Sequence, residues 1–168
     1  MLPGPNQIIA CPHCCGLARY GTWLSGSSFG AIVWSDGKQE ALGMMPPRPP
    51  PVVRCRHCAV YYWLAEGEKV GTVKPWGGEG QQVNPAWNAA QEVEKPTEEE
   101  YYQALETNLA KDHQQERSLR VLAWWRRNDG LRFNPVGSAT ASSACRRNLE
   151  ALARLLNELV LHHASNDG

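Results

Sequence analysis

The stretches CPHCCG, residues 11–16, and CRHC, residues 55–58, contain five of the six cysteines in the chain. In each stretch two cysteines are separated by two residues, a spacing that directs two thiolates toward one point. Two such pairs can together supply four sulfurs in a tetrahedron around one metal ion. We therefore predict that Cys11, Cys14, Cys55 and Cys58 are metal ligands.

The third cysteine of the first stretch leaves an alternative open. Cys15 is followed by Gly16, so ligation by Cys11 and Cys15 would place a glycine directly after the second ligand. Cys14 is preferred because its spacing from Cys11 matches that of the second pair. Pro12 also presets the tight turn between these two ligands. Cys15 is then either a packed residue or a spare thiol.

Both cysteine pairs lead into aromatic and apolar residues typical of strands, and together they resemble the two knuckles of a zinc ribbon or of its rubredoxin-like relatives. The resemblance covers roughly residues 8–66 and implies a small β-rich fold around a tetrahedral metal site. Family members usually have glycine directly after the second cysteine of each knuckle, where the backbone is left-handed. This chain has Cys15 and Ala59 there, at a cost of about 1 to 2 kcal/mol each. Structural Zn²⁺ can supply about 10 to 16 kcal/mol of folding free energy, which exceeds the cost of these two left-handed residues.

Zinc is the metal that we expect, with iron as the alternative. The resemblance implies zinc for structure or, in rubredoxin-like proteins, iron for electron transfer. Without the knuckle glycines we expect the backbone N–H groups to approach the sulfurs less closely. Such contacts tune the potential of iron sites, so their loss favours zinc. Four thiolates leave no position open for water, and metal-assisted hydrolysis is therefore not expected.

The composition changes along the chain from strand-forming to helix-forming residues. We predict an α+β protein in which a small zinc-ribbon domain, residues 1–70, is followed by a separate three-helix unit, residues 97–168. The segment between them, GTVKPWGGEGQQVNPAWNAAQEVEKP at 71–96, is rich in glycine and proline and is expected to be a linker. Its Trp76 and Trp87 are expected to dock the linker on a neighbouring unit. Within the first domain, Asp36 and Gly37 predict a hairpin turn.

The first two predicted helices have clear start signals. Thr97 is expected to be an N-cap, with Glu100 completing a capping box. A second helix is expected to start at Asp112, with Gln115 as its box partner, and to stop near Gly130.

A third helix is expected to begin near Ser142 or Ser143 and to run almost to the C-terminus. It carries an apolar stripe on one face, which we expect to be buried against the other helices or against a partner. The members of this stripe are Cys145, Leu149, Leu152, Leu156 and Leu159.

The charge balance and the apolar content of the sequence argue against a nucleic-acid-binding, a secreted or a membrane-spanning protein. The 17 basic and 17 acidic side chains balance, which argues against a surface that follows nucleic-acid phosphates. The N-terminal residues MLPGPNQIIA have neither the basic region nor the apolar run of a secretory signal. No stretch has the roughly 20 apolar residues that span a bilayer. We therefore expect a cytoplasmic protein that does not bind membranes, with cysteines that bind metal instead of forming disulfides.

No catalytic residues can be assigned. Cys145 falls on the apolar stripe and is expected to be a buried hydrophobe. His13 and His57 lie inside the knuckles, where we expect their side chains to point outward. No nucleophile, base and orienting group can be assembled from the sequence, so we do not expect an enzyme.

The leading hypothesis is a zinc-stabilised adaptor that binds another protein, or a second copy, through its helical part. Its motivation is a surplus of clustered apolar and aromatic residues. The helices, residues 97–160, also resemble tandem repeats of the tetratricopeptide kind, and the whole arrangement resembles uncharacterised small bacterial proteins that join a zinc ribbon to such helices. The alternatives are a nucleic-acid-binding ribbon and a rubredoxin-like electron carrier. Nucleic acid could contact local pairs of arginines at 54 and 56, 126 and 127, and 146 and 147.

Overall fold

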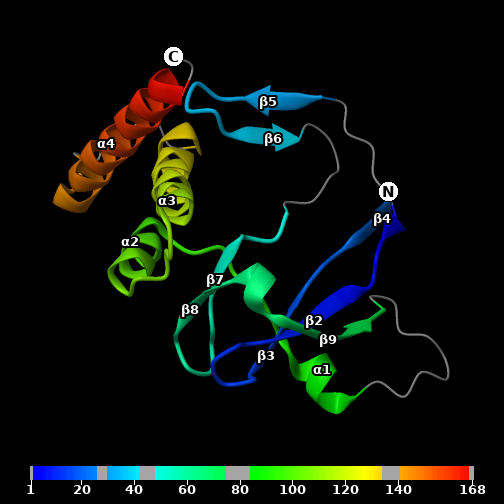
Figure 1. The fold of residues 1–168 in the computed structure, drawn as a ribbon. Helices are drawn as coiled ribbons and strands as arrows, with labels where there is room; N and C mark the ends of the chain where they lie inside the picture. The colour runs from blue at the N-terminus through cyan, green and yellow to red at the C-terminus, as the bar shows by residue number, and fades with distance from the viewer. Residues whose placement is uncertain (1, 26–29, 42–47, 75–83, 134–140, 167–168) are drawn as a thin grey trace. The chain divides into compact units, whose positions relative to one another are not determined.

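The computed structural model describes residues 2–25, 30–41, 48–74, 84–133 and 141–166. The chain is α+β, as predicted, and divides into two compact units, Met1–Pro96 and Thr97–Gly168 (Figure 1). Among the described residues, the strands lie in the first unit and the three longest helices in the second. Within the described residues, no helix combines the length and the apolar character needed to cross a membrane.

A four-stranded sheet forms the larger part of the first unit. Its strand order is β10–β3–β2–β9, with β2 antiparallel to both neighbours and β10 parallel to β3. The bounds are Asn6–Ala10 for β2, Leu17–Tyr20 for β3, Glu68–Val73 for β9 and Gln91–Glu92 for β10.

Three further strand pairs lie outside this sheet. The hairpin of β7 (Val52–Arg54) and β8 (Tyr61–Trp63) continues through the short 3-10 helix Leu64–Glu66 into β9. The other two pairs are β1 (Leu2–Pro3) with β4 (Trp23–Ser25), and β5 (Ala31–Val33) with β6 (Gln39–Ala41).

Strand β2 is buried on both faces. Its successive side chains point to opposite sides, and each side is covered by other residues of the unit. Ile9 packs with Val53 and Tyr62 of the β7–β8 hairpin and with two of the cysteines. Ile8, on the other face, packs with Val73, Ala90 and Trp87. Both isoleucines are almost completely buried. The strand before the first cysteine pair is thus the centre of the first unit.

Part of the segment expected to be a linker belongs to this unit. Helix α1 (Pro85–Ala89) is capped by Asn84, whose side-chain oxygen accepts from the Ala86 N–H at 3.0 Å. The Trp87 ring lies directly over Gly71 of β9, so that a Cβ added to Gly71 would be 2.2 Å from the ring. Trp87 therefore docks its segment on the sheet, as predicted. Trp76 lies outside the described residues.

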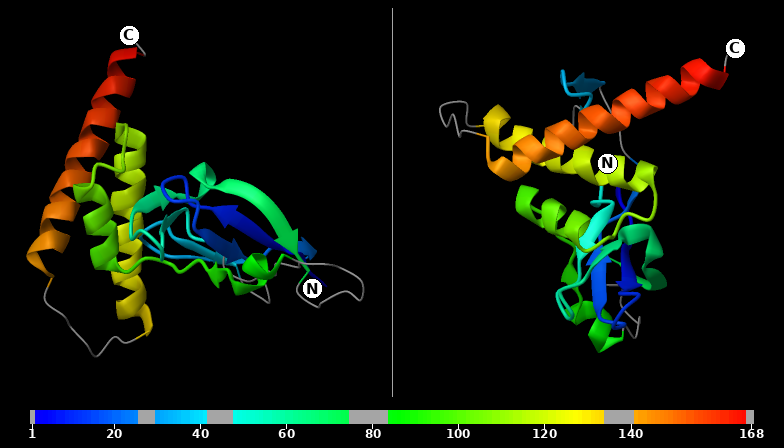
Figure 2. Two further views of the ribbon diagram at one scale, coloured as in Figure 1. Left: turned by 90° about the horizontal axis from the view of Figure 1, so that it is seen from below. Right: turned by 60° about the vertical axis from the view of Figure 1, so that its left-hand side comes forward.

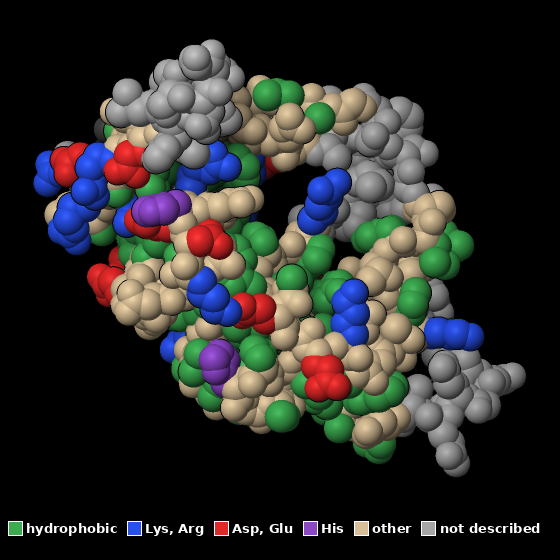
Figure 3. Space-filling view, in the orientation of Figure 1, with side chains coloured by type: hydrophobic (Ala, Val, Ile, Leu, Met, Phe, Trp, Pro, Cys, Tyr) green, Lys and Arg blue, Asp and Glu red, His purple; other side chains and the backbone are tan. Residues whose placement is uncertain are grey.

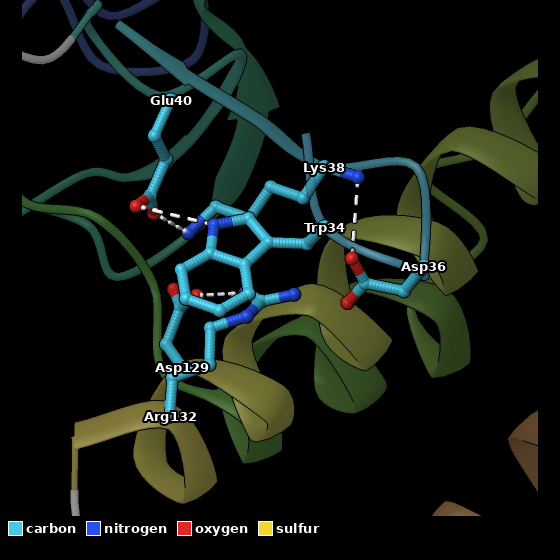
Figure 4. Close-up of polar contacts among 6 residues, drawn as sticks. All are labelled: Trp34, Asp36, Lys38, Glu40, Asp129 and Arg132. Carbon is cyan, nitrogen blue, oxygen red and sulfur yellow. Dashed lines mark hydrogen bonds and ion pairs between the residues drawn. The ribbon is translucent and has the colours of Figure 1, made fainter. Parts of the chain in front are cut away.

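The predicted hairpin is confirmed between β5 and β6. The turn is closed by the Gly37 N–H donating to the Trp34 carbonyl at 2.9 Å, and Gly37 has a φ of 77°. Across the hairpin, Glu40 of β6 accepts from the indole N–H of Trp34, which follows β5, at 3.4 Å, and Glu40 also pairs with Lys38 on its own side (Figure 4).

The second unit starts with the predicted capping box. Helix α2 (Glu98–Glu106) has the Glu100 N–H donating to Thr97 Oγ1 at 3.2 Å, and the Thr97 N–H donating back to the Glu100 carboxylate at 2.9 Å. Helix α3 (His113–Phe133) begins as predicted after Asp112, whose side chain accepts from the Gln115 N–H at 2.7 Å.

Helix α3 continues three residues past Gly130, near which it was predicted to stop, and is described as far as Phe133. Gly130 has no positive φ, so it does not form the left-handed cap with which glycine ends a helix. Instead Arg132, beyond the glycine, donates to Asp129 at 2.6 Å, one turn earlier in α3 (Figure 4).

Helix α4 (Ser143–Asn166) starts at the predicted place, since Ser142 Oγ accepts from the Cys145 N–H at 3.0 Å. The predicted apolar stripe is only partly correct. Leu152 and Cys145 are buried, but Leu149 is 41% and Leu156 is 52% exposed. The side chain of the fifth member, at position 159, lies outside the described ones.

A buried polar residue explains the rotation of α4 relative to the prediction. Asn148 is 2% exposed and donates to the Arg120 carbonyl of α3 at 3.0 Å, while the Arg120 guanidinium donates to its oxygen at 3.3 Å. The side of α4 that meets the rest of the unit therefore includes Asn148, Ala151 and Leu155. This rotation leaves Leu149 and Leu156 at an exposed edge.

We predict that Gly130→Ala stabilises the protein by about 0.5 to 1 kcal/mol, measured by urea unfolding. A Cβ at position 130 would meet nothing within 4 Å, and the helical backbone accepts alanine. The matched control is Gly37→Ala, which also has open space but a left-handed φ. This control should destabilise by about 1 to 2 kcal/mol. Stabilisation by both changes, or by neither, would contradict the assigned backbone at these two positions.

Candidate metal centre

The first knuckle connects β2 to β3 through a tight turn. The Cys11 N–H donates to the Gly16 carbonyl at 2.9 Å, and the Cys15 N–H donates to the Cys11 carbonyl at 2.9 Å. Inside the turn the His13 N–H points at the Cys11 sulfur, 3.4 Å away.

The second knuckle connects β7 to β8 with the same pattern of bonds. The Cys55 N–H donates to the Val60 carbonyl at 2.9 Å, and the Ala59 N–H donates to the Cys55 carbonyl at 2.8 Å. The His57 N–H points at the Cys55 sulfur, again at 3.4 Å. The two knuckles are therefore equivalent residue by residue.

This equivalence bears on the choice between Cys14 and Cys15. Cys15 has a φ of 59° and Ala59 a φ of 60°, so both occupy the left-handed place that follows the second cysteine of a knuckle. Cys14 then corresponds to Cys58. The geometry thus groups Cys14, and not Cys15, with the other three cysteines.

The backbone N–H contacts to sulfur that the missing glycines were expected to remove are present. Each knuckle accepts the left-handed backbone without glycine and retains its 3.4 Å N–H···S contact to the first cysteine. The loss of N–H···S contacts that was expected to favour zinc over iron is therefore not observed.

The sulfurs of Cys11, Cys14, Cys55 and Cys58 all lie within 4.8 Å of one another. Cys11 Sγ is 3.9 Å from Cys58 Sγ, and Cys14 Sγ is 3.6 Å from Cys55 Sγ. Four sulfurs bound tetrahedrally at the usual Zn–S length of 2.3 Å would be about 3.8 Å apart. These two distances fit a tetrahedral metal ion, and the four sulfurs together are close enough to hold one.

The cluster has a buried and an open side. Cys11 and Cys55 are buried, Cys58 is half-buried, and Cys14 is exposed. Burial raises the pKa of Cys11. At Cys55 burial acts in the same direction, but the N–H groups of Cys58 and His57 and the neighbouring thiols outweigh it and lower the pKa to about 7.

The thiols compete with one another for ionisation. The Gly16 N–H lowers the pKa of Cys14, but the hydrogen bonds that the Cys14 thiol donates to the sulfurs of Cys58, Cys55 and Cys11, together with partial desolvation, raise it to about 12. Burial followed by the charge of the cysteines raises the pKa of Tyr62 to about 12. One thiol thus ionises at the expense of its neighbours, and four thiolates together require a cation among them.

The histidines of the knuckles are outside the sulfur cluster. Both are exposed, as predicted, but His57 has a contact that the sequence analysis missed. A Cβ added to Gly16 would lie 2.4 Å from His57 Cδ2. Gly16 is thus needed for the close approach of the two knuckles. Neither the spacing nor the residue type at position 16 indicates this contact, because it joins segments about 40 residues apart in sequence.

The second knuckle is braced by arginines. Arg54 Nε donates to the Ala59 carbonyl at 3.3 Å, and its guanidinium lies 5.9 Å from the centre of the Tyr61 ring. Arg56 pairs with Glu94, which follows β10. The sixth cysteine, Cys145, is buried in α4 as predicted, away from solvent and in the other unit.

We predict that Gly16→Ala destabilises the first unit by about 1 to 3 kcal/mol, because the added methyl group would overlap the His57 ring. Urea unfolding followed by tryptophan fluorescence measures the effect. Adding His57→Ala to this variant should recover part of the loss, since most of the overlapping ring atoms are removed. An unchanged unfolding midpoint for Gly16→Ala would show that the knuckles do not approach this closely.

In comparisons with known proteins, no family model, no curated protein and no solved structure matches this chain.

Proposed function

We propose that the cysteines at 11, 14, 55 and 58 bind one Zn²⁺ in a closed, structural site, and that the protein is a non-catalytic adaptor whose helical unit binds another protein. The observation that supports the metal site is the sulfur geometry. Two of the four cross-knuckle distances, Cys14–Cys55 at 3.6 Å and Cys11–Cys58 at 3.9 Å, are close to the spacing of about 3.8 Å that a tetrahedral Zn²⁺ needs.

The donor set favours a structural ion over a catalytic one. Four thiolates complete a tetrahedron and leave no place for a bound water, which catalytic zinc sites retain. Thiolate is a soft ligand, which selects zinc or iron over magnesium or calcium. Zn²⁺ would supply charge neutralisation to the four thiolates and a cross-link between the knuckles.

Iron remains the alternative ion, because the N–H···S contacts at Cys11 and Cys55 are of the kind that tunes iron–sulfur potentials. Absorption distinguishes the two ions, since ferric thiolate sites are coloured and Zn²⁺ sites are not. A purified protein with one zinc and no visible absorption supports the proposed site.

Surface composition supports a protein partner. On the face shown in Figure 3, Lys and Arg side chains are interspersed with Asp and Glu, without a region of one sign. Leu131 of α3 and Leu149 and Leu156 of α4 are exposed on the helical unit. Exposed leucines in a mixed-charge surface suit a protein partner better than a polyanion.

Nucleic acid is less favoured for a further reason. Arg54 and Arg56, the two arginines nearest the cluster, already have partners in the first unit, the Ala59 carbonyl and Glu94. Arg120 and Arg132 of α3 pair with acidic residues of their own helix. The acidic partners of Arg56, Arg120 and Arg132 reduce the positive charge that phosphates could neutralise.

We predict that Cys14→Ser releases the ion, whereas the matched variant Cys15→Ser retains one ion per chain. Loss of a true ligand should weaken binding by more than the roughly 10- to 100-fold that loss of a supporting group causes. Native mass spectrometry of both variants measures the stoichiometry directly. Retention by Cys14→Ser together with loss by Cys15→Ser would reverse the ligand assignment.

We also predict that a chelator unfolds the knuckles but leaves the helical unit folded, because the metal free energy is folding free energy only where the ligands lie. Circular dichroism at 222 nm should retain most of its amplitude after chelation. The fluorescence of tryptophans in the first unit should change. Simultaneous loss of both signals would mean that the two units fold as one.

A further inference from the structure

Helix α4 carries an exposed apolar edge beside its buried side. At 100° per residue, Leu149 and Leu156 are about 20° apart around the helix, and Ala153 lies within about 60° of both. All three are exposed, and Leu149 and Leu156 are exposed by 41% and 52%. The helix also extends beyond α2 and α3 toward its C-terminal end (Figure 2).

We propose that this edge binds the same edge of a second copy of the chain, with the two α4 helices antiparallel. The inference rests on the proposed role of the helical unit in protein binding and names the partner. In an antiparallel pair centred between residues 152 and 153, Leu149 of each copy faces Leu156 of the other. Ala153 then lies near the crossing point, where its small side chain lets the helices approach.

The charges next to this edge specify the orientation. The exposed residues Arg146, Glu150, Arg154 and Glu158 alternate in sign every four residues, and this row is adjacent to the row that contains Leu149 and Ala153. In the antiparallel register, Glu150 of one copy lies almost opposite Arg154 of the other. The two differ by only one residue, about 1.5 Å, along the helix axis. The two-fold symmetry of the pair repeats this contact, so that the dimer contains two Glu150–Arg154 pairs.

A parallel pair in register would have the opposite effect. It would place Glu150 against Glu150 and Arg154 against Arg154, and like charges at such positions are unfavourable. The alternation therefore favours the antiparallel arrangement and is itself self-complementary, as a two-fold interface requires.

The test is native mass spectrometry and sedimentation of the full zinc-loaded chain over a range of concentrations up to several hundred micromolar. The wild type should dimerise with increasing concentration. Leu156→Glu should raise the dimer dissociation constant at least about tenfold, since it places a charge in the apolar contact. Because Leu156 is exposed in the single chain, this variant should retain its helical circular dichroism. The control Asn157→Glu adds the same charge at a neighbouring exposed position and should have a smaller effect.

A charge exchange tests the register separately from folding. Glu150→Arg and Arg154→Glu should each weaken self-association, because each places like charges opposite one another. Mixing the two variants should restore it, since every contact in the mixed pair then joins Arg to Glu.

A wild-type chain that stays monomeric, or a dimer that Leu156→Glu leaves intact, would overturn this inference. Failure of the mixed variants to associate better than either alone would overturn the antiparallel register. The same mass spectra report zinc content, so loss of the dimer with one zinc still bound separates failure of this inference from failure of the proposed metal site.

Discussion

Four thiol groups within 4.8 Å of one another can all be ionised only if a cation lies among them, and much of the first unit is arranged around this constraint. Without the cation, the pKa of Cys55 is lowered to about 7 while that of Cys14 is raised to about 12. This imbalance is the expected result of like charges that share a small space. A divalent ion would replace the competition with four attractive contacts, which would offset the cost of burying the thiolates of Cys11 and Cys55 at the ends of β2 and β7.

The same constraint explains how two separate pieces of β structure are held together. The β7–β8 hairpin and the four-stranded sheet are distinct sheets, connected along the chain through Leu64–Glu66. Their other contacts include the side chains around Ile9, Val53 and Tyr62 and the sulfur cluster itself. A two-stranded hairpin is at most marginally stable alone. Placing a metal cross-link at this junction would stabilise the hairpin and also offset the left-handed backbone of Cys15 and Ala59.

The sequence predicts those features that depend on local spacing. Each knuckle turn, the Thr97 capping box and the Gly37 turn involve only a few neighbouring residues, so their spacing can be recognised in the sequence. Features that depend on a distant partner were not predictable in this way. The contact between Gly16 and His57 and the docking of Trp87 over Gly71 both join segments far apart in sequence. Glycine is found at both places because a neighbouring side chain fills the position that a Cβ would occupy. A single sequence does not reveal such a neighbour.

The apolar stripe predicted for α4 was only partly correct for a related reason, and the difference bears on the proposed function. Apolar periodicity alone predicts that Leu149, Leu152 and Leu156 are all buried, since they lie within about 60° of one another around the helix. The buried pair of hydrogen bonds between Asn148 and Arg120 decides between them, because an amide with its partners satisfied in the interface costs far less than one left unpaired. A polar residue inside the unit therefore sets which leucines face solvent. It follows that the exposed edge of α4 is fixed by the internal packing of the helical unit, so a partner would meet a surface that is already formed before binding.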